Sequence, residues 1–208
     1  MSSKKGAHRE EGIFIAVAGP SGVGKTTLCK ALIRQIPGLK FSVSYTTRPP
    51  RPSEVDGRDY IFVSEKEFRE RIRREEFAEW AENYGFLYGT SRETMTDYLK
   101  KGCDLILDVD TQGARSLKVA YPGGIFVFIL PPSLKVLKER LMSRGAEKNA
   151  SLDKRFNNAV EEIREIIWYD YVIFNDRLDS AVDYLRGIYL AEKSRRERLM
   201  KKIEGFIK

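Results

Sequence analysis

The chain has few cysteines and no long hydrophobic run, and both shortages limit the class of protein. Its 208 residues include only Cys29 and Cys103, which cannot build a disulfide scaffold, so we expect both thiols to be reduced and buried in regular elements. No apolar stretch approaches the ~20 residues of a membrane-spanning helix. Residues 1–12 are polar and charged without an apolar centre, which predicts a disordered tail and not a secretory signal. We therefore expect a cytoplasmic protein that binds no membrane.

The excess of positive charge does not by itself indicate a nucleic-acid partner. The sequence holds 37 Lys and Arg against 30 Asp and Glu, a formal net charge of +7. Much of the surplus alternates with acidic residues in segments such as 69–71 and 193–198, a pattern typical of solvated helix faces. Other arginines stand in loops where a polyanionic substrate would favour them. We therefore expect a phosphorylated small molecule and no nucleic acid.

Residues 19–26 carry the most specific functional signal. They read Gly-Pro-Ser-Gly-Val-Gly-Lys-Thr, which fits the phosphate-binding loop spacing G-x-x-x-x-G-K-[ST] between an expected strand and an expected helix. Such a loop directs backbone N–H groups and a helix N-terminus at an anion. Lys25 would reach the β- and γ-phosphates, and the Thr26 hydroxyl would hold Mg²⁺. The predicted triphosphate contacts are Gly19, Pro20, Ser21, Gly22, Val23, Gly24, Lys25, Thr26 and Thr27.

Expected strands that alternate with expected helices predict an α/β fold. After the strand at 13–18, core strands are expected at 103–110, 125–130 and 171–174. The alternation predicts a P-loop NTPase-type parallel sheet flanked by helices. Sites in such sheets lie beyond the carboxyl ends of the strands, so the loop, Asp108 and Asp110 should meet on one rim.

Residues 41–90 interrupt this alternation. They begin with a short expected strand at 41–43, which a turn-rich loop at 45–59 follows, and they contain Ser64, which is expected to cap a helix. Aromatic residues at 77–88 predict paired strands, and Thr90 is expected to cap the helix that follows. The segment therefore reads as an inserted lobe with a mixed, mostly antiparallel sheet.

Several long motifs closely resemble guanylate kinase. They stand at 44–52, 54–60, 79–81, 88–90, 107–113 and 129–133, and the resemblance covers essentially the whole chain after residue 12. It implies a single domain at 13–208, with a core (13–40, 91–135 and 170–208), a GMP-binding lobe (41–90) and a helical lid (136–169). It also implies that the protein phosphorylates GMP, and dGMP, with ATP and Mg²⁺ in purine nucleotide metabolism.

The resemblance gives Glu79 the role of reading the base. Guanine presents two adjacent donors, N1–H and the N2 amine, and a carboxylate accepts both. Adenine has an acceptor at N1, which the same carboxylate would repel. Ser44 and Thr90 are the implied hydroxyl partners of the base, and Asp110 also lines the implied site.

Four other residues match the positions that grip the GMP phosphate in this family, namely Arg48, Arg51, Tyr60 and Tyr88. Arginine forks suit a phosphate dianion, and a tyrosine hydroxyl adds a neutral donor. The two tyrosines could instead be core aromatics, and the residues alone leave this alternative open. Arg48 is also expected to bridge the donor and acceptor phosphates as charge moves between them.

The implied lid supplies two more arginines. Arg144 and Arg155 flank the polar segment 145–151 and correspond to the family's lid arginines, with Arg140 as a helper. Phosphoryl transfer needs positioning and neutralisation of charge on the migrating group more than covalent chemistry. A closing lid would supply both while it expels water.

The resemblance also places two groups around the nucleotide. Asp108 is the implied partner of Thr26 beside the magnesium ion. Asn175 and Asp176, which follow the last expected strand, stand at the usual position of the adenine pocket. Two departures from the family pattern leave these groups in place: segment 145–151 has fewer acids than usual, and Tyr45 stands where bacterial members often have histidine.

Two other functions stay open, as does the choice between a monomer and a homo-oligomer. A guanylate-kinase-like binding module would serve as a phosphopeptide receptor, but such modules have typically lost the loop lysine or the lid arginines. A sister kinase would act on another phosphorylated acceptor, such as a ribose bisphosphate. Base recognition by Ser44, Glu79 and Thr90 argues against that acceptor.

Overall fold

A five-stranded parallel sheet forms the centre of the protein. The computed structural model describes residues 11–143 and 149–207. The sheet runs in the order β2-β7-β1-β8-β9, and every neighbouring pair is parallel. Its strands are β1 (Phe14–Ala18), β2 (Lys40–Phe41), β7 (Leu105–Asp108), β8 (Ile125–Leu130) and β9 (Tyr171–Phe174). The predicted parallel sheet is confirmed, with the first strand at its middle.

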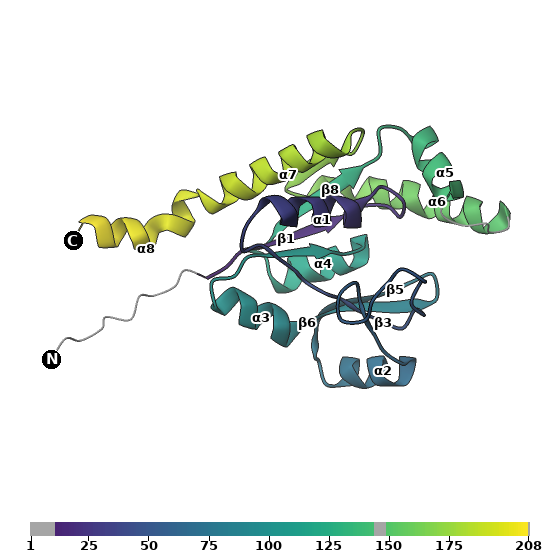
Figure 1. The fold of residues 1–208 in the computed structure, drawn as a ribbon, viewed down its shortest axis with the longest axis horizontal. Coiled ribbons are helices and arrows are strands. Elements are labelled where there is room, and N and C mark those ends of the chain that lie inside the picture. Colours follow the sequence, from purple (N-terminus) through teal and green to yellow (C-terminus); the bar gives the residue numbers. More distant parts are fainter. Residues whose placement is uncertain (1–10, 144–148, 208) are drawn as a thin grey trace.

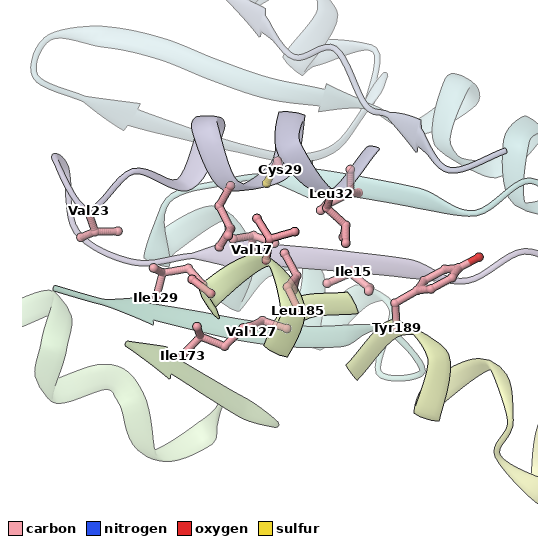
Figure 2. Packing of buried hydrophobic residues seen from close by; sticks show 14 of the residues in the cluster. Ile15, Val17, Val23, Cys29, Leu32, Val127, Ile129, Ile173, Leu185 and Tyr189 are labelled. Atoms are coloured by element: carbon pink, nitrogen blue, oxygen red, sulfur yellow. The ribbon is translucent and has the colours of Figure 1, made fainter. Parts of the chain in front are cut away.

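Helices cover both faces of this sheet, which explains why β1 is apolar at every position. The helices are α1 (Lys25–Gln35) and α7 (Leu178–Lys193) on one face and α3 (Arg92–Lys100) and α4 (Thr111–Ala120) on the other (Figure 1). Side chains alternate along β1, so that Ile15 and Val17 pack with α1 and α7 while Ala16 packs with α3 and α4. Figure 2 shows Leu32 of α1 and Leu185 of α7 beside Ile15 and Val17.

The inserted segment folds into a second sheet with a small core of its own. Its strands, in the order β4-β3-β6-β5, are β3 (Tyr45–Thr46), β4 (Ile61–Phe62), β5 (Phe77–Asn83) and β6 (Phe86–Ser91). β3 pairs with β4 in parallel, and β6 pairs with β3 and β5 antiparallel, so the predicted mixed sheet is confirmed. The helix α2 (Glu65–Arg73) follows Ser64, whose hydroxyl accepts from the Glu67 amide as predicted, and its Phe68 stacks on Phe77.

Three of the remaining helices lie toward the two ends of the molecule: α5 (Leu134–Ser143) and α6 (Asn149–Arg164) at one end and α8 (Arg196–Ile207) at the other (Figure 1). The 3-10 helix η1 (Glu165–Trp168) follows α6 and packs its Trp168 against Phe126 of β8. Leu137 and Leu141 of α5 and Ala159 of α6 join the core that contains α1. α8 extends away from the body. No helix within the described residues is long and apolar enough to cross a membrane.

Three local predictions were wrong. Thr90 does not cap α3, because the hydroxyl of Ser91 accepts from the Thr94 amide at 3.2 Å. Residues 171–174 form the strand β9 with the predicted bounds, but it is an edge strand and not a core strand: only Ile173 is buried, because β9 pairs with β8 alone among the described strands. Cys103 precedes β7 and is partly exposed, whereas Cys29 is buried as expected.

Candidate active site

The phosphate-binding loop joins β1 to α1 at the carboxyl edge of the sheet. Gly24, immediately before α1, has a φ of +95°, a left-handed conformation that favours glycine. The Lys25 ammonium donates to the carbonyl oxygens of Gly19 at 2.7 Å and Pro20 at 3.4 Å, so it lies across its own loop. The loop therefore presents a lysine and a helix N-terminus together, an arrangement that suits a phosphate chain.

Thr26 and Asp108 meet beside this loop. Asp108 ends β7 and pairs with Val17 of β1, and the Thr26 hydroxyl donates to its Oδ2 at 2.5 Å. Hydroxyl and carboxylate oxygens are ligands that Mg²⁺ prefers, and this ion is usually completed by waters and substrate phosphates. The pair therefore fits a magnesium ion that would arrive with the nucleotide.

Asn175 and Arg140 support the back of the loop. The buried side-chain amide of Asn175 donates to the Val23 carbonyl at 2.7 Å. Arg140, on α5, donates to the same Val23 carbonyl at 3.4 Å and to the Asn175 carbonyl at 3.2 Å. The Asn175 contacts are thus with the loop itself, and its role in an adenine pocket stays a prediction.

The residues predicted to read the base lie on adjacent strands of the lobe. Glu79 on β5 pairs with Thr90 on β6, and their exposures are only 6% and 1%. The Thr90 hydroxyl donates to Glu79 Oε1 at 2.7 Å. Ser44 directly precedes Tyr45 of β3, which pairs with Gly89 beside Thr90. The fold therefore brings Ser44, Glu79 and Thr90 together.

The core helix α4 meets this group from the other side. Asp110 caps α4, since its Oδ1 accepts from the Gly113 amide at 2.7 Å. Burial raises the pKa of Glu79 to about 7, and the negative charge of Asp110 adds to the increase, while the hydrogen bond from Thr90 opposes it. Burial also raises the pKa of Asp110. Hydrogen-bond donors stabilise the charged form of a buried carboxylate. A ligand that donates to Glu79 and Asp110 would therefore be favoured between the lobe and α4.

Arg48, Tyr60 and Tyr88 form the second group predicted for the lobe. The Arg48 guanidinium lies 5.4 Å from the centroid of the Tyr60 ring, and the Tyr60 and Tyr88 rings meet edge to face at 6.1 Å. Burial raises the pKa of Tyr60, and the negative charge of Asp108 contributes. This cluster therefore lies within electrostatic reach of the phosphate-binding loop.

Sequence reasoning missed Glu54, which stands inside one of the quoted motifs. Arg48 Nη2 donates to both of its carboxylate oxygens at 2.8 Å, and the Arg51 amide donates to Oε2 at 2.8 Å. Although burial alone would raise the pKa of Glu54, these donors hold it below its usual value. Glu54 thus orients Arg48 and the Arg51 backbone, and the positive charge of the Arg51 side chain also lowers the pKa of Glu54.

Arg155, in the segment predicted to be a lid, contacts both the phosphate-binding loop and the inserted segment. It lies on α6, and its Nη2 donates to the Ser21 hydroxyl of the loop at 3.3 Å. Its guanidinium also lies 5.4 Å from the centroid of Tyr84, at the turn between β5 and β6. The other predicted lid arginine, Arg144, lies outside the described residues.

A further acid on α6 was also missed. Burial raises the pKa of Glu162 to about 7, with Lys25 lowering it and Asp110 raising it, so these three charges lie near one another. One glutamate among many on a charged helix gives no local signal, and only the packing of α6 over the loop reveals it.

Comparisons with known proteins agree on one family. A family model described as guanylate kinase matches residues 12–192. The guanylate kinase of Syntrophus aciditrophicus (strain SB) is 53% identical over 203 residues, which cover 98% of each chain, and that of Geobacter sulfurreducens is 48% identical over 192 residues, or 92% of this chain and 95% of the relative. The crystal structure of guanylate kinase from Anaplasma phagocytophilum covers 94% of each chain with a TM-score of 0.79 and 30% identity.

Proposed function

The chain belongs to the guanylate kinase family, and we propose that the residues between its phosphate-binding loop and its lobe form the site of the family reaction. The protein transfers the terminal phosphoryl group of ATP to GMP, with Mg²⁺, and the products are ADP and GDP. Two features of the structure fit this reaction. The core carries the phosphate-binding loop with Lys25, and the lobe carries the buried pair of Glu79 and Thr90.

Recognition of guanine rests on Glu79, and this is the observation that carries the assignment. Its carboxylate is buried, accepts from Thr90 and lies near the negative charge of Asp110. In the ionised form it accepts both N1–H and the N2 amine of guanine, and it repels the N1 acceptor of adenine. The carboxylate therefore supports a base-specific acceptor site and argues against a ribose bisphosphate as acceptor.

Phosphoryl transfer rests on cations from the phosphate-binding loop, the lobe and the lid. Lys25 neutralises the β- and γ-phosphates, and Thr26 with Asp108 would hold the magnesium ion, which supplies further neutralisation when bound. Arg48 grips the GMP phosphate with Arg51, Tyr60 and Tyr88, and it exchanges Glu54 for the phosphate as the substrate arrives. Arg155, together with Arg144 of the lid, stabilises the charge on the migrating group.

We also propose that dGMP serves as a second acceptor, because the selectivity assigned to Ser44, Glu79 and Thr90 is directed at the base. The core comprises 13–40, 91–135 and 170–208, the lobe 41–90 and the lid 136–169. The reaction takes place in the cytoplasm, where ATP and GMP are both available.

An acceptor panel tests the function directly. The purified protein is incubated with ATP, Mg²⁺ and one of GMP, dGMP, AMP, CMP, UMP or ribose 1,5-bisphosphate, and ADP formation is followed. We expect turnover of GMP and dGMP alone. Turnover of the ribose bisphosphate would contradict the acceptor assignment, and no turnover by a folded, ATP-binding protein would favour the binding module.

A further inference from the structure

Gly113 stands where the core helix meets the base-reading carboxylate. It is the third residue of α4 and is buried, and its amide donates to Asp110 at 2.7 Å. A Cβ added at Gly113 would lie 2.4 Å from Glu79 Oε2, 3.1 Å from Glu79 Cδ and 3.3 Å from Asp110 Oδ1. Real Cβ atoms essentially never approach another atom to 2.4 Å. A side chain at position 113 must therefore displace the Glu79 carboxylate.

The backbone gives no other reason for a glycine here. Gly113 lies within α4 and does not adopt the left-handed conformation that favours glycine. Inside a helix, alanine is normally preferred to glycine because glycine loses more conformational freedom on folding. The reason for a glycine at position 113 is thus that the Glu79 carboxylate occupies the space that a side chain would fill.

We propose that Gly113 is a positioning residue for guanine recognition, because its missing side chain lets the Glu79 carboxylate reach the first turn of α4. The inference rests on the proposed role of Glu79. The carboxylate is held between two elements: the Thr90 hydroxyl on the lobe and the first turn of α4 on the core. The positive end of the helix favours negative charge at this point.

Base specificity is therefore set by the lobe and the core together. The lobe strand β5 supplies the Glu79 carboxylate, and the core helix α4 determines how closely that carboxylate approaches its first turn. A side chain at position 113 would move the carboxylate by about 1 Å, a displacement that can cost a site about a hundredfold in efficiency. The stability of the fold changes little, because the displaced atom is the far end of a flexible side chain.

The test is a double-mutant cycle between Gly113→Ala and Glu79→Ala. The matched control is Gly187→Ala on α7, where an added Cβ meets nothing within 4 Å. The KM for GMP, the KM for ATP and the thermal unfolding midpoint are measured for each variant. We expect Gly113→Ala to raise the KM for GMP about tenfold or more and to leave the KM for ATP within about twofold. In the Glu79→Ala background the same substitution changes the KM for GMP less than about twofold.

The outcomes separate this inference from the function on which it rests. A KM for GMP that Gly113→Ala leaves unchanged, or an equal increase in the Glu79→Ala background, overturns the role of Gly113 while base reading by Glu79 stands. A KM for GMP that Glu79→Ala leaves unchanged overturns both. If Gly113→Ala fails to fold, a double variant that folds supports the clash with Glu79, and a double variant that also fails to fold overturns it.

Discussion

The hydroxyl of Thr90 donates to the carboxylate of Glu79 at 2.7 Å across two adjacent strands of the lobe. Both side chains are buried, yet the carboxylate has a pKa of about 7, because burial disfavours its charged form and Asp110 lies near. The residue that must be ionised to accept two donors from guanine is therefore partly protonated at neutral pH in the free enzyme.

This gives a pH dependence of GMP binding. As the pH falls below about 7, Glu79 becomes protonated and can no longer accept both donors, so kcat/KM for GMP should fall up to about tenfold per unit. Above that pH it should reach a plateau, and the KM for ATP should follow a different profile. Glu79→Gln is the control, because it retains the titration of the GMP phosphate and loses that of the carboxylate. Identical profiles for the two proteins would rule out Glu79 as the titrating group.

The same pKa predicts a stability effect of opposite sign. The pKa of Glu79 is higher in the folded than in the unfolded chain. The contribution of the protonated side chain to the free energy of unfolding is therefore fully present at low pH and is lost as the pH rises through about 7. Glu79→Gln cannot ionise, and we expect it to be more stable than the wild type at pH 8 by about 1–3 kcal/mol, with little difference at pH 4. Urea unfolding at both pH values measures the difference. Curves that stay parallel from pH 4 to 8 would contradict this expectation.

Lys25 is expected to act on turnover and not on folding. Its ammonium lies across the loop and donates to the Gly19 carbonyl. Lys25→Ala should lower kcat by about a hundredfold or more, because charge on the migrating group loses a fixed cation. Arg34→Ala, on the exposed last turn of the same helix, is the matched control and should retain full activity. A folded Lys25→Ala protein with unchanged kcat would remove Lys25 from the catalytic set.

Tyr84 offers a test of the lid arginine. Its ring lies 5.4 Å from the Arg155 guanidinium, a distance at which the π-face attracts the cation. Tyr84→Leu should lower kcat about threefold to tenfold relative to Tyr84→Phe, because Arg155 loses the ring that orients it in the first variant and keeps that ring in the second. Tyr98→Leu on α3 is a control for loss of an exposed tyrosine. Equal kcat for Tyr84→Leu and Tyr84→Phe would show that the ring does not position Arg155.

Much of the fold could be predicted because its signals are local. The apolar run of β1 indicated a strand covered on both faces, and the loop motif indicated its own position between β1 and α1. Thr90 shows the limit of such reasoning. Thr90 and Ser91 are both residues that cap helices well, and the choice of Ser91 depends on the tertiary bond that holds Thr90 to Glu79.

The parts of the site that the sequence did not predict depend on contacts that only the folded chain shows, and two of the three join segments far apart in the sequence. Glu54 binds Arg48 within the same loop, but its charge alone did not distinguish it from other surface acids. Glu162 comes within electrostatic reach of Lys25 only because α6 packs near the loop. Gly113 matters because β5 brings Glu79 against α4, a contact between residues 34 positions apart in the chain.

The most direct test of the account is the preference for GMP over AMP in the wild type and in Glu79→Gln. The glutamine has the same shape as the glutamate, but it cannot accept both guanine donors and can donate to the N1 acceptor of adenine. The ratio of kcat/KM for GMP to that for AMP should fall about a hundredfold or more, while the KM for ATP stays unchanged. A ratio equal to that of the wild type would contradict the reading of guanine by Glu79, and with it the assignment of this pocket.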